Sequence, residues 1–205
     1  WRRYLDDTPS FIMNSDQILA LFRDAGALSV GHFRLSSGLH SQGYLQCAQV
    51  LQHPAHARSL GEAIVARAEV WRPMTVLSPA MGGVVIGHEV AHGLNVRAIF
   101  AERTAGDLNL RRGFVLAPGE RVLVVEDVIT TGKSTRETID LARQMGAEVV
   151  GAAAIIDRGS GIELEVPWFA LAKIELPPYD PDRCPLCQSK IPIVKPGSRP
   201  DSNTR

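Results

Sequence analysis

Two adjacent carboxylates, Glu126 and Asp127, stand just before a short loop of small residues. The loop, residues 130–135, reads TTGKST and is dominated by hydroxyl groups and a glycine. Backbone N–H groups at the start of a helix lack partners and lie at the positive end of the helix dipole, so such a loop can bind a phosphate. Carboxylates would repel a phosphate and are better suited to sugar hydroxyls or a divalent cation. These residue types together indicate a site for a phosphorylated ribose.

The elements on either side of the loop predict how these groups are positioned. Residues 122–125 (VLVV) form an aliphatic run typical of a parallel strand buried on both faces, and we expect the two acids to end it. Apolar residues then recur at helical spacing up to Gly146, which offers a C-terminal stop. An arbitrary acidic pair in this place would more often simply cap the helix. A Walker loop is excluded, because no glycine lies five residues before Gly132.

The order of these residues resembles a known motif. The aliphatic run followed by EDVITTGKS closely resembles the phosphoribosyl-diphosphate (PRPP) motif of type I phosphoribosyltransferases. The resemblance implies that the carboxylates hold the ribose hydroxyls while the loop binds the 5′-phosphate. The PRPP-binding residues implied by this motif are Glu126, Asp127, Val128, Ile129, Thr130, Thr131, Gly132, Lys133 and Ser134.

A segment near the N-terminus indicates which group of phosphoribosyltransferases the chain resembles. Alternation and turn residues over 32–52 predict a β-hairpin outside the main sheet. Its LSSGLHS stretch, 35–41, followed by an aromatic residue, resembles the N-terminal hood of orotate phosphoribosyltransferases, although many of those carry Lys where this chain has Ser36. An Asp-Arg pair after the predicted strand 149–156 also matches the orotate-contacting Arg of that family. The orotate-binding residues implied are Thr130, Arg158, Tyr44 and Ser36.

Two other segments are implied to hold the diphosphate of PRPP. Met81 and Gly82 belong to a second strand, loop and helix, where glycines allow the backbone to approach a ligand closely. The polar segment 102–114 is expected to be a hairpin or mobile loop that closes over PRPP, but it lacks the Lys and His of many orotate enzymes. Arginine can still neutralise a diphosphate through paired hydrogen bonds. The loop cations are Arg103, Arg111 and Arg112, and the catalytic residues implied are Asp127, Glu126 and Arg103.

The chain as a whole suits one α/β domain. Helical spacing predicts a helix capped by Ser15 and ending near Gly26, and a last strand over 168–176. Strands alternate with helices over 76–156, which predicts a mainly parallel central sheet flanked by helices, with ligands at the carboxyl ends of its strands. We therefore expect a single domain, 1–205, of the type I phosphoribosyltransferase fold. Its parts are a small N-terminal hood at about 32–52, a core at about 53–176 and a C-terminal tail at 177–205.

Composition limits the kinds of partner that the protein can have. Lysine plus arginine and aspartate plus glutamate both number 22, so no overall positive field would recruit nucleic acid. We expect no nucleic acid partner, no membrane association and a cytoplasmic protein, because no long apolar span or signal-peptide pattern occurs. The family resemblance also implies a homodimer and Mg²⁺ as cofactor, bound mainly through PRPP without dedicated protein ligands.

Three cysteines do not make a disulfide framework. Cys184 and Cys187 have the spacing of half a zinc knuckle, but the sequence offers no second cysteine pair, and all six histidines precede residue 93. We therefore expect no zinc site completed within the chain; a metal shared across a dimer is the less favoured alternative. The CPLC tail also resembles a bacterial subgroup of orotate phosphoribosyltransferases.

The resemblance implies transfer of a phosphoribosyl group from PRPP to orotate, giving orotidine 5′-monophosphate and diphosphate in pyrimidine synthesis. Two alternatives stay open at this point. A purine-type phosphoribosyltransferase would use the same central motif with a different hood. A non-catalytic regulator would keep the fold as a PRPP sensor, an idea that the loop without lysine slightly favours and the intact acidic pair opposes.

Overall fold

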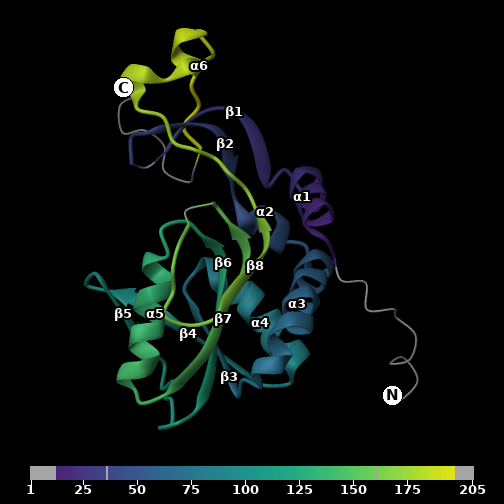
Figure 1. Ribbon diagram of the computed structural model, residues 1–205, viewed down its shortest axis with the longest axis vertical. Helices are drawn as coiled ribbons and strands as arrows, with labels where there is room; N and C mark the ends of the chain where they lie inside the picture. The colour runs from purple at the N-terminus through teal and green to yellow at the C-terminus, as the bar shows by residue number, and fades with distance from the viewer. Residues whose placement is uncertain (1–12, 36, 160, 197–205) are drawn as a thin grey trace.

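The computed structural model describes residues 13–35, 37–159 and 161–196. A six-stranded sheet in the order β5-β4-β3-β6-β7-β8 forms its centre (Figure 1). Neighbouring strands run parallel except β4 and β5, so the predicted mainly parallel α/β sheet is confirmed. The strands are β3 (Thr75–Pro79), β4 (Arg97–Thr104), β5 (Asp107–Leu110), β6 (Arg121–Ile129), β7 (Glu148–Asp157) and β8 (Trp168–Lys173).

Helices cover both faces of this sheet (Figure 1). Strand β6 shows why the sheet needs two covers: Leu123 and Val125 belong to one hydrophobic cluster, whereas Val122 and Val124 belong to another. All four side chains are fully buried, as the aliphatic run predicts. The first cluster is built with α1 (Ser15–Asp24), α2 (Cys47–Leu51), α3 (Pro54–Ala68) and α4 (Gly82–Leu94), and the second with α5 (Lys133–Gln144).

Two predicted boundaries are corrected. The acids do not end the central strand, because β6 continues to Ile129 and pairs there with Asp157 of β7. Backbone pairing with β7 thus extends the strand beyond the point where apolar side chains stop. The cap of α1 is Asn14 rather than Ser15, since the Asn14 side chain accepts a hydrogen bond from the Gln17 N–H at 3.0 Å and the Gln17 side chain accepts one from the Asn14 N–H at 2.9 Å.

A small antiparallel sheet stands apart from the main one, which confirms a hairpin outside it. Its strands are β1 (Leu28–Arg34) and β2 (His40–Leu45), so the hairpin begins and ends earlier than the predicted 32–52. Helix α2 occupies 47–51 instead, because Cys47, Val50 and Leu51 share one buried face that a strand would place on two. We call β1, β2 and their connection the hood.

The segment 102–114 contains the predicted hairpin. Strands β4 and β5 pair antiparallel and turn at Ala105 and Gly106, both with positive φ. The final strand β8 ends at Lys173, three residues before the predicted end. Among residues 13–35, 37–159 and 161–196, no helix has the length and apolarity that crossing a membrane requires.

The tail returns to the hood (Figure 1). It contains η2 (Pro181–Arg183) and α6 (Pro185–Gln188), and it pairs with the hood on either side of them: Tyr179 lies opposite His40, and Val194 lies opposite Phe33. The expectation that nothing in the chain completes the cysteine pair is wrong. Both His32 and His40 lie beside Cys184 and Cys187, because the returning tail joins residues that are far apart in sequence.

Candidate active site

The two predicted ligand loops meet at one edge of the sheet. Strands β3 and β6 are parallel neighbours, so the loops at their carboxyl ends lie side by side. A Cβ atom added to Gly82 would lie 2.6 Å from the Asp127 carboxylate, and one added to Gly83 would lie 2.8 Å from the Val125 carbonyl oxygen. These glycines therefore let the start of α4 approach the acidic pair. Met81 beside them is exposed and follows a cis peptide bond from Ala80.

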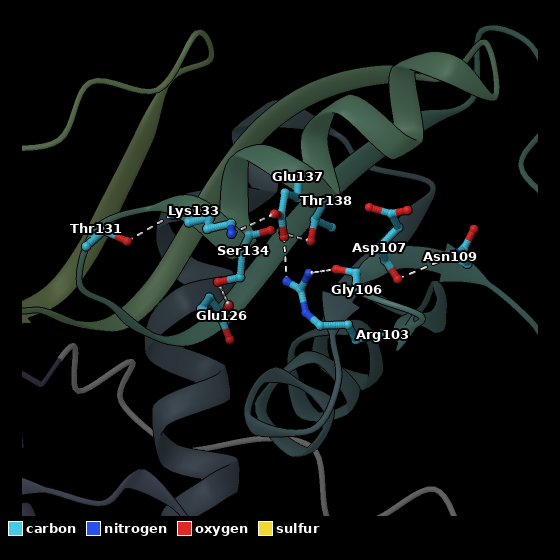
Figure 2. Close-up of polar contacts among 10 residues, drawn as sticks. All are labelled: Arg103, Gly106, Asp107, Asn109, Glu126, Thr131, Lys133, Ser134, Glu137 and Thr138. Atoms are coloured by element: carbon cyan, nitrogen blue, oxygen red, sulfur yellow. Dashed lines mark hydrogen bonds and ion pairs between the residues drawn. The ribbon is translucent and has the colours of Figure 1, made fainter. Parts of the chain in front are cut away.

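Glu126 is buried and Asp127 is half-buried, and no cation of the described residues neutralises them. Glu126 is 5% exposed and accepts a hydrogen bond from the Ser134 hydroxyl at 2.9 Å (Figure 2). Asp127 accepts one from the Val128 N–H at 2.8 Å. Within the described part of the chain, neither carboxylate forms an ion pair. Burial and the neighbouring Asp127 raise the pKa of Glu126 to about 8, and burial also raises the pKa of Asp127. A ligand that offers hydroxyl groups or positive charge would stabilise the ionised pair.

Cys47 joins this site although sequence reasoning assigned it no role. Its buried thiol at the start of α2 interacts with Asp127, and burial together with the acidic pair raises the pKa of the thiol. The group therefore stays a neutral thiol at physiological pH. No local sequence signal connects residue 47 with residue 127; only the tertiary packing of α2, beside α3 and α4, brings them together.

The start of α5 is open toward solvent. Its cap, Gly132, has a φ of 70° and carries no side chain that could cap the first-turn N–H groups. Thr130, Thr131 and Lys133 are exposed around it. Ser134, one of the implied PRPP-binding residues, donates its hydroxyl to Glu126, and the Thr135 hydroxyl is buried. The loop thus offers backbone N–H groups and two threonine hydroxyls to an anion.

Two predicted cations converge on a residue that sequence reasoning missed. Glu137 forms ion pairs with Arg103 at 2.5 Å and with Lys133 at 3.7 Å (Figure 2). Arg103 also donates to the Gly106 carbonyl, and the arginine lowers the pKa of Glu137. The Lys133 to Glu137 spacing of four residues along a helix was a readable signal for one of these pairs.

The other two arginines of the β4–β5 region form no ion pair with the acidic pair among the described residues. Arg112 donates two hydrogen bonds of 2.8 Å to Glu102, which lowers the pKa of that carboxyl. Arg111 is exposed and forms no ion pair with any residue that the structure describes. Of the three predicted loop cations, Arg103 and Arg112 are each paired with a carboxylate. Among the described residues Arg111 has no such ion pair to break before it binds an anion.

Arg158 connects the central loop with the hood. Its N–H donates to the Ile129 carbonyl at 3.0 Å, and its half-buried guanidinium donates to the Leu176 carbonyl at 3.4 Å. Burial lowers the pKa of this arginine. The side chain of Leu176 in turn contacts the hood at Gly43, where an added Cβ would lie 2.5 Å away. Asp157 forms no ion pair with Arg158, so the guanidinium edge is not consumed by its neighbour within the described residues.

Tyr44 has its resolved contacts inside the hood. Its ring packs against Phe33 with 5.8 Å between centroids, and its hydroxyl accepts a 3.5 Å hydrogen bond from Gln46. The structure thus brings Glu126, Asp127 and Gly82 together, whereas Tyr44 contacts Phe33 and Gln46. Ser36 lies outside the described residues.

Comparison with known proteins agrees with this arrangement. Residues 46–175 match the phosphoribosyl transferase domain family. The chain is 50% identical over 188 residues to an orotate phosphoribosyltransferase of Desulforamulus reducens, covering 91% of this chain and 98% of that one. It is also 50% identical to the one from Heliobacterium modesticaldum, covering 91% and 100%.

A solved structure supports the same grouping. The orotate phosphoribosyltransferase from Aeropyrum pernix superposes with a TM-score of 0.66 at 26% identity, covering 76% of this chain and 93% of that one. The match of the domain family spans more than half of the chain, and the identity to full-length relatives is high. This chain therefore belongs to the phosphoribosyltransferase family, with the type I fold.

Proposed function

We propose that this protein transfers the 5-phosphoribosyl group of PRPP to orotate, giving orotidine 5′-monophosphate and diphosphate. One observation carries the proposal: a buried and a half-buried carboxylate, neither ion-paired with a described residue, lie beside the start of a helix that no side chain caps. That combination suits a ligand with a phosphate at one end and a hydroxylated, electron-poor ring at the other. The relatives named orotate phosphoribosyltransferase, at 50% identity over nearly their whole length, support orotate as the base.

The charges of the site match the charges of the reaction. When the bond from C1 of ribose to diphosphate breaks, positive charge develops on the ring and negative charge on the leaving group. Glu126 and Asp127 accept hydrogen bonds from the ribose hydroxyls and stabilise the positive ring. The loop at 130–134 binds the 5′-phosphate through the first-turn N–H groups of α5. Fixing two anionic reactants in this geometry contributes a large part of the rate.

The leaving diphosphate needs cations. Met81 and Gly82 offer backbone at the neighbouring loop, while Arg111 and Arg112 lie on the β4–β5 side. Arg103 can bind the diphosphate only after its ion pair with Glu137 breaks, so this ion pair holds the arginine beside the site before PRPP binds. Closure of the β4–β5 hairpin over PRPP would make that exchange and exclude water.

Mg²⁺ fits this donor set as a group carried by the substrate. The acidic pair supplies two carboxylates, and the described residues place no third carboxylate beside them in a metal-ligating cluster. Mg²⁺ keeps several waters and binds through one or two carboxylates together with substrate phosphates, so Glu126 and Asp127 would meet it through PRPP. When bound, the ion neutralises the diphosphate as it leaves.

Orotate is a planar pyrimidine that carries a carboxylate. A guanidinium suits both the carboxylate and the polar edge of the ring, so Arg158 orients the base for attack on C1. Thr130, Tyr44 and Ser36 belong to the same proposal as further contacts from the loop and the hood. A homodimer and a cytoplasmic location are proposed as well; light scattering on the purified chain tests the first and fractionation of the source cells the second.

A panel of bases tests the activity. With PRPP and Mg²⁺, we expect orotate to be consumed, followed by its loss of absorbance, and hypoxanthine and adenine to stay unchanged. Turnover of a purine without orotate would replace the proposal by a purine-type enzyme. PRPP binding, measured by calorimetry, without turnover of any base would indicate a regulator instead.

The pH dependence of kcat/KM for PRPP reports on the acidic pair. Because the pKa of Glu126 is raised to about 8, the pair holds a proton at neutral pH and loses it as the pH rises. We expect kcat/KM to increase with pH through about 8, since the ionised pair is the form that stabilises positive charge. Steady-state rates in buffers spanning this range, compared with Glu126→Gln, measure it. A rising limb of the same position in the variant would contradict the assignment.

Substitution of Arg103 tests whether its guanidinium stabilises the leaving diphosphate. We expect Arg103→Ala to lower kcat on the order of tenfold, because one charge that stabilises the leaving diphosphate is lost. The matched control is Arg143→Ala, which removes an arginine paired with Glu165 at 2.7 Å on the other end of α5. Equal kcat values for the two variants would exclude Arg103 from the reaction.

A further inference from the structure

Four potential metal ligands converge between the hood and the tail. They are His32 on β1, His40 on β2, Cys184 and Cys187 at α6, and their ligand atoms all lie within 4.8 Å of one another. The first three side chains are buried, and Cys187 closes the cluster from the exposed side. None of the four takes part in the phosphoribosyl transfer site, and all three cysteines of the chain are free thiols.

The distances between these atoms are those of a tetrahedral zinc site. Zinc bonds of about 2.0–2.1 Å to nitrogen and about 2.3 Å to sulfur place two nitrogens about 3.3 Å apart and a nitrogen about 3.6 Å from a sulfur. His32 Nε2 lies 3.0 Å from His40 Nδ1, 3.6 Å from Cys184 Sγ and 3.7 Å from Cys187 Sγ. Cys187 Sγ lies 3.3 Å from His40 Nδ1. Small adjustments would bring all four onto one ion.

The Ile191 carbonyl sets the tautomer of His32 that leaves Nε2 able to bind a metal. Nδ1 of His32 lies 2.8 Å from the Ile191 carbonyl oxygen, which can only accept, so that nitrogen carries the proton. The lone pair of Nε2 then points at the cluster. A histidine that ligates a metal usually donates its other N–H to a carbonyl or carboxylate in this way, which orients the ring.

The described part of the tail is joined to the hood by hydrogen bonds and not by a hydrophobic core. Neither hydrophobic cluster of the protein contains a residue of the described tail, 177–196. His40 and Tyr179 exchange two backbone hydrogen bonds, of 2.9 and 2.8 Å. Val194 donates to the His32 carbonyl at 2.8 Å and accepts from the Arg34 N–H at 2.9 Å. The Tyr179 hydroxyl also donates to the Gln42 side chain at 3.4 Å. Small units without a core are commonly stabilised by disulfides or by a structural metal.

We propose that His32, His40, Cys184 and Cys187 bind one Zn²⁺ ion within a single chain, and that this ion fixes the tail to the hood. Two sulfurs and two nitrogens select zinc over Mg²⁺ or Ca²⁺, which prefer oxygen ligands. Four protein ligands leave no open position, so the site is structural. It needs no second chain, unlike a metal shared across a dimer. Binding releases the thiol protons, because zinc takes thiolates.

Metal content of the full chain is the first measurement. The protein, purified under reducing conditions without an affinity tag that binds metals, is expected to contain one zinc per chain by elemental analysis. Replacing zinc by Co²⁺ should give the visible bands of a tetrahedral ion together with sulfur-to-cobalt charge transfer. A protein that holds no zinc after incubation with Zn²⁺ and reductant, or whose cobalt form lacks the sulfur bands, would overturn the proposal.

Variants distinguish the loss of a zinc ligand from a general destabilisation of the fold. We expect Cys187→Ser and His40→Gln to lose zinc and to lose hydrogen-exchange protection over 177–196, while the central sheet keeps its protection. The matched controls, Cys47→Ala and His88→Gln, change a cysteine and a histidine outside the cluster and should keep one zinc per chain. Full zinc in the double variant Cys187→Ser, His40→Gln would contradict the assignment of these ligands. So would a Cys184 to Cys187 disulfide found by mass spectrometry in freshly isolated protein. These readouts do not depend on turnover of orotate, so they can fail or succeed independently of the proposed activity.

Discussion

Asp127→Asn is expected to lower kcat/KM by about 10²- to 10³-fold, the loss typical of removing one group that stabilises transition-state charge. The amide keeps the size of the carboxylate and can still accept from the Val128 N–H, so the close packing against Gly82 is preserved. What disappears is the negative charge beside the ribose ring. Steady-state rates with PRPP varied at saturating orotate measure the effect.

Glu126→Gln extends the same prediction to stability. The pKa of Glu126 in the folded protein, about 8, lies above its ordinary value of 4.5. Between these values the folded state keeps a proton that the unfolded state has lost, so the free energy of unfolding falls as the pH rises from about 4.5 to about 8. The amide removes this penalty.

We therefore expect Glu126→Gln to be less active yet more stable than the parent at pH 8. The difference between about 8 and 4.5 limits this gain to roughly 5 kcal/mol, since one unit of pKa is worth about 1.4 kcal/mol. In a chain of this size each kcal/mol of that gain raises the unfolding midpoint by roughly 2–4 °C. Calorimetry at pH 8 and near pH 5 measures it, with the exposed Asp140→Asn as control. An equal gain at both pH values would show that ionisation of Glu126 is not its cause.

Gly132→Ala is expected to raise KM for PRPP by about 10²-fold. A Cβ atom at residue 132 would lie 2.9 Å from Ile162, and its φ of 70° is unfavourable for alanine. Relief of that strain must shift the first turn of α5, where the proposed phosphate site lies.

Gly119→Ala provides the matched control for backbone strain. Its φ is 75° and nothing lies within 4 Å of an added Cβ, so it carries a similar conformational cost in a turn away from the loop. Substrate titrations of both variants, with unfolding midpoints measured alongside, separate strain from binding. Similar KM values for the two would contradict a phosphate site at the start of α5.

The sequence by itself determined the central unit. The burial of residues 122–125 on both faces of the sheet, the loop and the start of α5 all follow from patterns within 121–146, because strand, turn and helix signals act over a few residues. The mainly parallel sheet followed from repetition of that unit. Arg158 could be placed at the end of its strand for the same reason.

Only the tertiary structure decided which distant side chains meet. Asp127 lies against Gly82 because β3 and β6 are neighbours in the sheet, and Arg103 meets Glu137 because the β4–β5 hairpin lies beside α5. Cys184 reaches His32 across 152 positions of sequence because the tail folds back onto the hood. Such contacts depend on strand order and chain reversal, which no local propensity encodes, so the sequence showed half of a zinc site where the folded chain brings together four ligands.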